Sequence, residues 1–460
     1  MTNGCATQKA ARGAAGRAAR GDVKRRGAIL ALVLIVMLAL GLLGSGLFAL
    51  TSTNGMEAGR AISAAQAFWA AEAGAEHMKA LAQRYRKPFP TIPYAGSPTG
   101  FLWGSNVLSG TTSHGAYSVD VMDDPAWANA SHALKKYVIR SRATSAGGAS
   151  QVVTLCAAIQ SYASYMHASN YERLTDGTPI YFGPGDVIDG PVYVNDQLNI
   201  CGGIPDPRFL QSVSSATDTV HYIAGATSSV FEAGLTLNAT PLDVSGQFSS
   251  DHIQNVRLKA QAGGLVLSGN YSSFTFDASG SFTYQPAGGG PTYTNYLAAL
   301  NGAIYVAGYV SNLSGAVNGN VTLAVQDSIY LGSNLVYASA VSPDPWNAAF
   351  NPANVDDSLG LIASNRVQIL GQNPISIHAA IMITSGDDGF GAQQWNQSFG
   401  HPSISLFGGL TQYRRGLVGQ TNGNGFRKNY RFDPRFMTDA PPFFPYSVYV
   451  FSRWMQSSGG

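Results

Sequence analysis

An unbroken apolar segment near the N-terminus constrains this chain more than any other feature. Residues 28–50 read AILALVLIVMLALGLLGSGLFAL and contain no charged side chain in 23 positions. As an α-helix this segment would be roughly 34 Å long, more than the ~30 Å hydrocarbon core of a bilayer. The apolar core of an ordinary secretory signal spans only about 7–15 residues. The segment therefore predicts a membrane-spanning helix.

The residues before this segment are strongly basic and determine its predicted orientation. Seven of the 28 Lys and Arg residues, but only one of the 26 Asp and Glu residues, precede Ala28. Basic flanks stay on the cytoplasmic side of a membrane, so the C-terminal bulk is predicted to be exported. The remainder of the chain is mildly acidic, which gives no support for nucleic-acid binding because that function usually needs a basic patch.

The apolar segment is followed by a second stretch with helical character. Residues 51–87 are rich in Ala, Glu, Gln and Met, which favour helix, and Pro88 ends the pattern. We expect one helix that continues outside the membrane, with a bend at Asn54-Gly55 as an alternative to a straight course. One helical face carries residues that recur every three or four positions and that we expect to pack against other helices: Ala58, Ala61, Ala65, Phe68, Glu72 and Ala75.

This order of features resembles a known family. A basic leader, Gly27, an apolar helix and the segment AFWAAEAGAEHM at residues 67–78 look like the N-terminus of type IV prepilins, and within them of the PilX-like minor pilins. The resemblance implies that a prepilin peptidase cuts between Gly27 and Ala28 and that the new N-terminus is methylated. It also implies that the helix packs with other pilins or pseudopilins. A plain signal anchor without any filament remains the alternative.

One position departs from the pattern of the family. Most pilins carry Glu at the fifth mature position, where it pairs with the N-terminal amine of a neighbour, whereas this chain has Leu32. A carboxylate inside a bilayer is costly and therefore usually functional. Its absence predicts weaker docking onto a subunit above, which favours a minor or tip role over a fibre-building role.

The chain after Pro88 shows no long helical pattern and predicts a mainly β fold. Residues 88–160 contain alternating segments that could form a small antiparallel sheet on the helix. Residues 301–411 contain a rapid succession of short β-branched segments separated by Gly and Asn. This texture favours a parallel β-solenoid, in which each rung packs on its neighbours. An antiparallel β-sandwich is the alternative, because periodicity alone cannot separate the two.

The sequence thus divides into seven segments. They are a cytoplasmic leader (1–27), a transmembrane helix (28–50), its exported continuation (51–87), a small pilin-like β region (88–160), a β-rich region (161–300), the solenoid or sandwich (301–445) and a C-terminal strand with its tail (446–460). Residues 180–202 and 408–445 also resemble a functionally uncharacterised β-rich C-terminal region of pilin-like proteins. That resemblance supports a secretion or pilus context and implies no known chemistry. The N-terminal segment predicts a single-pass protein of the bacterial inner membrane with an exported C-terminal domain, and both a periplasmic place and a place in a pilus or at the cell surface stay open for this domain.

A basic and aromatic cluster near the C-terminus is the strongest ligand candidate. Arg427, Lys428, Tyr430 and Arg431 form a patch that could bind an acidic glycan or another surface ligand, as in an anchored adhesin. The alternative is that the arginines of this region stack on aromatic rings as part of the fold. We expect no nucleic-acid partner.

Acidic residues offer two weaker candidates for chemistry. Asp186, Asp189, Asn195 and Asp196 could supply oxygen ligands to calcium, or form turns between strands. The pair Asp387 and Asp388, near His378 and His401, could serve a β-helix polysaccharide-active enzyme. Neighbouring residues of an extended chain point to opposite faces, however, so a solvated loop is favoured.

Neither the acidic residues nor the cysteines lead to an expected cofactor. Cys156 and Cys201 would lie in an oxidising compartment, where they could pair or remain unpaired core residues. The sequence contains no metal-binding spacing and no nucleotide-binding or hydrolase motif. We therefore expect no enzymatic activity, no metal and no cofactor.

Overall fold

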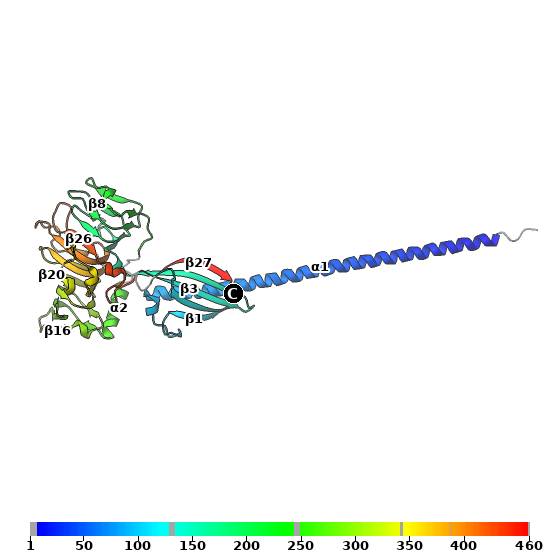
Figure 1. The fold of residues 1–460 in the computed structure, drawn as a ribbon, viewed down its shortest axis with the longest axis horizontal. Coiled ribbons are helices and arrows are strands. Elements are labelled where there is room, and N and C mark those ends of the chain that lie inside the picture. Colours follow the sequence, from blue (N-terminus) through cyan, green and yellow to red (C-terminus); the bar gives the residue numbers. More distant parts are fainter. Residues whose placement is uncertain (1–6, 128–133, 243–248, 341–343, 387, 459–460) are drawn as a thin grey trace, which may run out of the picture.

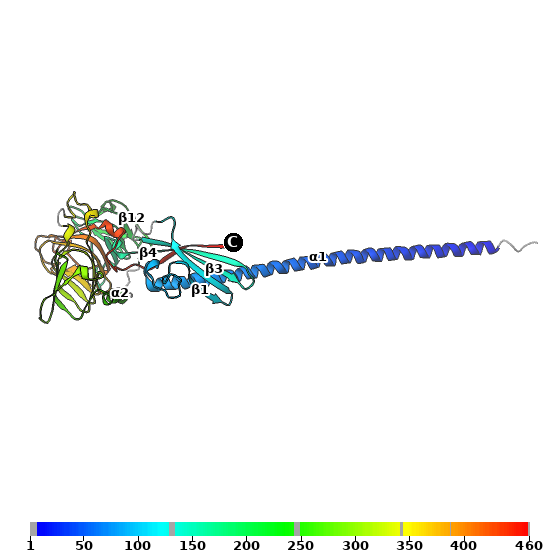
Figure 2. The same ribbon diagram turned by 60° about the horizontal axis from the view of Figure 1, so that its bottom comes forward.

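A computed structural model describes residues 7–127, 134–242, 249–340, 344–386 and 388–458. One long helix projects from a body made almost entirely of strands (Figure 1). A small sheet lies along the C-terminal part of this helix, and a larger β-rich part lies beyond its end (Figure 2). The predicted mainly β class with a long N-terminal helix is confirmed.

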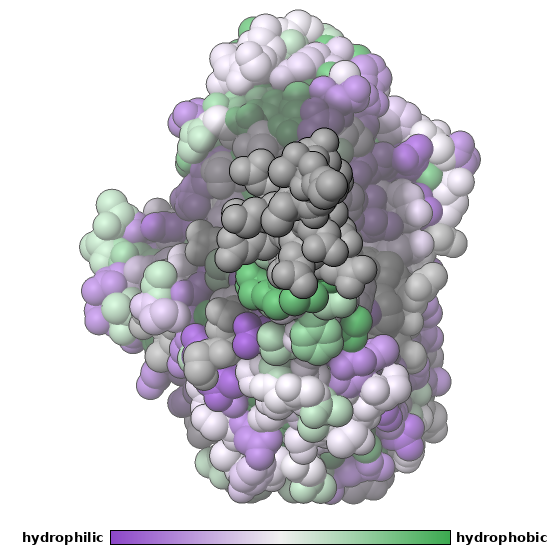
Figure 3. Space-filling view, turned by 90° about the vertical axis from the view of Figure 1, so that its right-hand side faces the viewer, coloured by the Kyte–Doolittle hydropathy of each residue, from purple (hydrophilic) through white to green (hydrophobic). Residues whose placement is uncertain are grey.

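The helix α1 spans Thr7–Tyr85 without interruption and so passes through Asn54 and Gly55 as helix. Its apolar stretch is long enough to cross a membrane. Every side chain from Ala28 to Ile62 is exposed. Figure 3 views the molecule from the right-hand side of Figure 1 and shows green apolar side chains near its centre, against a surrounding surface of mixed polarity. An apolar helix exposed on all sides needs lipid or other helices around it.

The C-terminal part of α1 packs on a five-stranded antiparallel sheet. In spatial order its strands are β1 (Gly104–Thr112), β2 (Gly115–Asp123), β3 (Leu134–Ser145), β4 (Ser150–Gln160) and β27 (Val450–Ser458). The helix residues buried here are mostly small: Ala67, Ala70, Ala71, Gly74, Ala75 and Ala82, together with Met78. A Cβ atom at Gly74 would lie 2.4 Å from Ser141 Oγ, so the contact is close.

The larger part contains a 20-stranded sheet in which most neighbours are parallel. Its longest ladder runs, in spatial order, through β13 (Leu265–Leu267), β17 (Ala303–Val306), β19 (Asn320–Val325), β21 (Ser358–Ala363), β23 (Ile375–Ile383), β25 (Ser403–Arg414), β5 (His167–Tyr171), β7 (Val192–Val194), β10 (Val213–Ser215) and β12 (Leu235–Thr236). The ladder departs from sequence order where β25 meets β5, because Thr411 lies opposite Ala168. The sheet therefore runs across the predicted boundary between residues 300 and 301.

Further parallel strands flank this ladder. One row consists of β14 (Tyr271–Phe276), β18 (Val310–Val317), β20 (Ser328–Tyr337), β22 (Arg366–Ile369) and β24 (Gly389–Ala392). Another consists of β26 (Arg427–Phe432), β6 (Val187–Asp189) and β9 (Arg208–Phe209), and joins β25. A hairpin adds β15 (Ser281–Pro286) and β16 (Tyr293–Tyr296), and β8 (Leu198–Cys201) pairs with β11 (Val220–Ile223).

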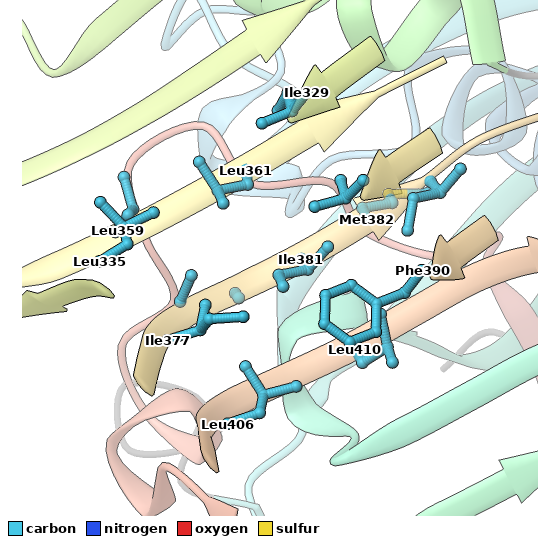
Figure 4. Close-up of a cluster of buried hydrophobic side chains, with 14 of the residues drawn as sticks. Ile329, Leu335, Leu359, Leu361, Ile377, Ile381, Met382, Phe390, Leu406 and Leu410 are labelled. Carbon is cyan, nitrogen blue, oxygen red and sulfur yellow. The ribbon is translucent and has the colours of Figure 1, made fainter. Parts of the chain in front are cut away.

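The core of the larger part is built from side chains stacked in register. Leu361 lies opposite Ile381 in the next strand, and Ile381 lies opposite Leu410 in the one after it. All three are essentially inaccessible to solvent, and Figure 4 shows them among other leucine and isoleucine side chains of successive strands. Complete burial of each such side chain contributes about 1.5–3 kcal/mol. This packing explains why the β-branched segments between residues 301 and 411 form strands.

One element was not expected from the sequence. The helix α2 (Ser249–Gln261) lies after Pro88, in the part predicted to be mainly β, and it is too short to contradict the absence of a long helical pattern there. Its Ile253 and Val256 are buried while Leu258 is half exposed, and the helix packs against β13, β17 and β19. Only 13 residues long and with few apolar positions, it gave too short a pattern to detect.

Candidate functional site

The predicted helix-packing face is divided by the structure. Ala58, Ala61 and Ala65 are exposed, so they are accessible to another helix. Ala75 is buried against the protein's own sheet. The accessible small residues therefore follow the apolar segment and extend into the first turn that contacts the sheet, where Ser63 bonds to Ser145 of β3.

Phe68 and Glu72 face the last strand of the protein's own sheet. The indole Nε1–H of Trp454, on β27, donates to Glu72 Oε2 at 2.9 Å, and its ring lies edge-on to Phe68 with centroids 5.6 Å apart. Both helix residues are half-buried. They thus attach the C-terminal strand to α1.

The predicted cleavage position lies inside α1. Gly27 and Ala28 are both helical, and Ala28 is exposed. Leu32 is 63% exposed and has exposed apolar neighbours along the helix. The leader before Gly27 is helical from Thr7 onward.

The predicted ligand patch on β26 is split by the alternation of strand side chains. Arg427 is exposed and donates from Nε to the Ser403 hydroxyl at 3.0 Å. Arg431 is half-buried and donates to the carbonyl oxygen of Pro345. Lys428 and Tyr430, by contrast, are buried. The four side chains therefore do not form one surface.

The buried lysine of this strand is compensated by a buried acid. Lys428 Nζ lies 2.6 Å from Asp186 Oδ2, and the Lys428 amide donates to Asp186 Oδ1 at 2.8 Å. Burial lowers the pKa of Lys428, and Asp186 opposes this effect by favouring the charged form. A buried ion pair of this kind holds two segments in one arrangement and adds little net stability.

A second buried charge pair lies next to the first. Arg415 and Glu172 directly follow β25 and β5, and Arg415 Nη1 lies 2.5 Å from Glu172 Oε2. His167 Nε2 lies 2.9 Å from the other carboxylate oxygen, and the Ser169 hydroxyl also donates to it. The guanidinium of Arg415 lies 3.8 Å from the centre of the Phe182 ring. All the charged groups of this cluster are withdrawn from solvent.

The protonation states of this cluster follow from competing effects. Burial alone would raise the pKa of Glu172, but Arg415 and the hydrogen bonds from His167 and Ser169 outweigh it and lower the pKa to about 2. Burial also lowers the pKa of His167, although Glu172 opposes this. Glu172 is therefore ionised and His167 is neutral, with its Nε2–H directed at the carboxylate.

The geometry of this cluster suits a structural role. A cavity lined by His167, Arg415 and Lys428 adjoins the cluster and measures about 10 Å³, too small for an organic ligand. The alternative interpretation of the basic residues applies here, because Arg414 and Arg435 also lie over aromatic rings, those of Tyr171 and Tyr337. Glu172 and His167 were not predicted from the sequence, where their only signal is their placement in a segment with few charges.

The four oxygen-bearing residues proposed for calcium do not converge. Asp186 pairs with Lys428, Asp196 with Arg173 at 2.6 Å, and Asp189 lies 3.9 Å from Arg431. The side chain of Asn195 instead bonds to Asn170 and to the backbone of Leu242. Within the described ranges, no group of three His, Cys, Asp or Glu residues could hold a metal ion.

The residues considered for polysaccharide chemistry differ in their burial and in their partners. Asp387 lies outside the described residues, and Asp388 is exposed and pairs with Arg366 at 2.5 Å. His378 is buried and its Nδ1 accepts from the Tyr337 amide at 3.1 Å, while His401 is half-buried.

Cys156 and Cys201 are both free. Cys201 is buried, and Cys156 lies half-buried on β4. Burial raises the pKa of the Cys201 thiol, which makes it a weak nucleophile at neutral pH. The disulfide that the sequence left open is therefore not formed in this structure.

Comparisons with known protein families, with curated proteins and with solved structures found no match to this chain.

Proposed function

We propose that this chain is a prepilin-like minor subunit anchored in the bacterial inner membrane. In this proposal the apolar part of α1 is held in the membrane and then among the helices of neighbouring pilins or pseudopilins. The small sheet and the larger β-rich part are displayed outside. The machine would be a type IV pilus or a type II secretion-like system, and the protein's role in it would be assembly, with no chemical reaction.

One observation carries this proposal: a single helix has two different environments along its length. From Ala28 to Ile62 all its side chains are exposed and mostly apolar, while between Ala67 and Ala82 one face of small residues, including Ala71 and Ala75, is buried under an antiparallel sheet. An ordinary signal anchor needs only the exposed apolar part of such a helix. The rigid continuation from the apolar segment into a packed domain is what a helical assembly of subunits requires, since small side chains permit close approach of helices.

The minor role rests on position five of the proposed mature chain. Leu32 offers no carboxylate to the N-terminal amine of a neighbour. The large exported part is a second argument, because it extends well to the sides of α1 and would be difficult to repeat at every turn of a tightly wound fibre (Figure 1).

We also propose that the parallel ladders form a β-solenoid. The support is the pairing pattern, in which β17, β19, β21 and β23 are parallel neighbours in one row and β18, β20 and β22 in another. Alternate strands of the chain thus return to the same row, as successive coils of a solenoid do.

The assembly role is tested by photo-crosslinking in cells that contain the candidate pilus or secretion machine. A benzoyl-phenylalanine is placed at Ala61 or Ala65, which are exposed on α1. The proposal expects a covalent adduct with another prepilin-like subunit from both sites. Ala233, exposed on the larger part, is the matched control and should give no such adduct. Adducts with lipid alone at Ala61 and Ala65 would support a plain anchor and contradict the proposal.

A further inference from the structure

A pocket of about 610 Å³ lies where the end of α1 meets the larger β-rich part. Its wall is formed by residues 84–88 at and just after the end of α1, by Thr91, by one side of α2, and by residues 443–446 of the returning chain. Figure 1 shows α2 close to the junction of the two parts. Small-molecule sites typically measure about 300–1,000 Å³, so the pocket has the size of a site for one organic ligand.

The charges around this pocket favour an anion. Its wall carries four cationic side chains and one acid: Arg84, Arg86, Lys87 and Lys259, and Asp251. Lys87 is half-buried, and its pKa is lowered by burial and by the like charge of Lys259. Two lysines that repel each other across one pocket would both be stabilised by a negative group placed between them.

Aromatic rings give the same pocket an apolar side. Tyr85, Phe443 and Tyr446 all line it. The ring of Phe443 is 38% exposed, and Lys259 Nζ lies 5.7 Å from its centre. A ligand with a flat ring could therefore contact Phe443 while its charged end reaches Lys259.

The backbone is unusual at two points of this wall. Arg86 and Phe443 adopt left-handed conformations, with φ of +47° and +58°. Such conformations are uncommon for bulky residues and tend to occur at ligand-binding sites. They turn the chain at the end of α1 and before Phe444, so that both segments face the pocket.

We propose that this pocket binds a small organic anion, a carboxylate or phosphate carried on a flat ring. The anionic group lies between Lys87 and Lys259, and the ring lies against Phe443. This site is separate from the proposed helix-packing face and does not depend on a role in a pilus.

Isothermal titration of the full chain in detergent tests the site. The probes are benzoate and phenyl phosphate, with phenol as the uncharged analogue. At least one of the two anions should bind, and phenol should bind at least about tenfold more weakly. Binding of only one anion assigns the charged group as carboxylate or phosphate. No binding of either anion up to ~10 mM, or equal binding of phenol, overturns the proposal.

Two variants locate the binding. The double substitution Lys87→Gln with Lys259→Gln should weaken anion binding by about tenfold or more. Lys79→Gln changes a lysine of α1 that does not line the pocket, and should leave affinity within about twofold. Removal of two mutually repelling charges should not lower the midpoint of thermal unfolding. If the double variant does not fold, Lys259→Gln alone, on the exposed side of α2, replaces it. Unchanged affinity in the folded variant overturns the assignment.

Discussion

The hydroxyl of Ser161 donates a hydrogen bond to the carbonyl oxygen of Pro445, 284 positions further along the chain. The Tyr162 amide donates to the same oxygen at 3.1 Å, and Ser161 pairs with Tyr446 in an antiparallel bridge. The chain therefore leaves and re-enters the small sheet at one point. The whole larger part is an insertion between two neighbouring strands, β4 and β27.

This arrangement predicts that the insertion can be removed. Replacement of residues 162–445 by a Gly-Ser linker of about four residues should leave α1 and the five-stranded sheet folded, because neighbouring antiparallel strands can be joined by a short hairpin. Circular dichroism in detergent should show strand signal and one cooperative unfolding transition. A control chain that keeps the insertion but ends at residue 446 lacks β27. Its five-stranded sheet is incomplete, so it should unfold at a lower temperature than the full chain. Loss of cooperative unfolding in the excised chain would contradict the insertion account.

The contact between α1 and the sheet is tested by two glycines of the same helix. Gly74→Ala should destabilise the protein by about 1–3 kcal/mol, because a Cβ there would overlap Ser141 and Tyr117. Gly59→Ala should stabilise it by up to ~1 kcal/mol, since no atom lies within 4 Å of the added Cβ and alanine favours helix. Urea unfolding in detergent measures both. Equal effects of the two substitutions would argue against the close packing at Gly74.

His378 should make the larger part sensitive to acid. Burial, with a smaller contribution from Arg435, lowers the pKa of His378 to about 3. Below pH 6.5 the unfolded chain therefore binds a proton at His378 that the folded chain does not bind. The free energy of unfolding is highest above pH 6.5 and decreases as the pH falls toward 3. The expected loss is about 2 kcal/mol between pH 6.5 and 5.

The matched variant for this prediction is His378→Asn. Its amide oxygen can accept from the Tyr337 amide in place of Nδ1, but it does not titrate. Urea unfolding at both pH values should show a smaller loss in the variant than in the wild type. An identical pH dependence in the two proteins would show that His378 is not the sensitive group.

Two adjacent residues of β26 test where the basic side chains lie. Lys428→Met should cost about 3–5 kcal/mol, because it leaves Asp186 buried without its cation. Arg427→Met should change stability by no more than ~0.5 kcal/mol, because its side chain is exposed. Denaturant titration compares the two. A mild effect of both would contradict the buried pair of Lys428 and Asp186, and a larger effect of Arg427→Met would indicate that the strand faces the other way.

The sequence predicted the helix and the strands better than it predicted which strands and side chains pair with one another. The absence of charge from Ala28 to Leu50 and the small residues that follow were sufficient for α1, and β-branched runs were sufficient for strands such as β19 and β23. The pairing of β5 with β25 could not be foreseen, because it depends on a contact between residues more than 200 positions apart. The same holds for the pair Glu172 and Arg415.

The prediction of a ligand patch on β26 was wrong, and the reason could have been read from the sequence. Successive side chains of a strand point to opposite faces. In the sequence RKNYRF, Lys428 and Tyr430 therefore share one face, and Arg427 and Arg431 share the other. Because of this alternation, the four side chains of the predicted patch could not form one surface. Which face was inward still required the position of Asp186, 242 residues away.

The most direct test of the proposed role is the N-terminus of the mature protein, measured by mass spectrometry in cells with and without the prepilin peptidase. The account predicts a chain that begins at Ala28, carries a methyl group on its amine, and is absent from cells that lack the peptidase. A chain that retains residues 1–27 in both strains would contradict it and would leave an ordinary membrane anchor.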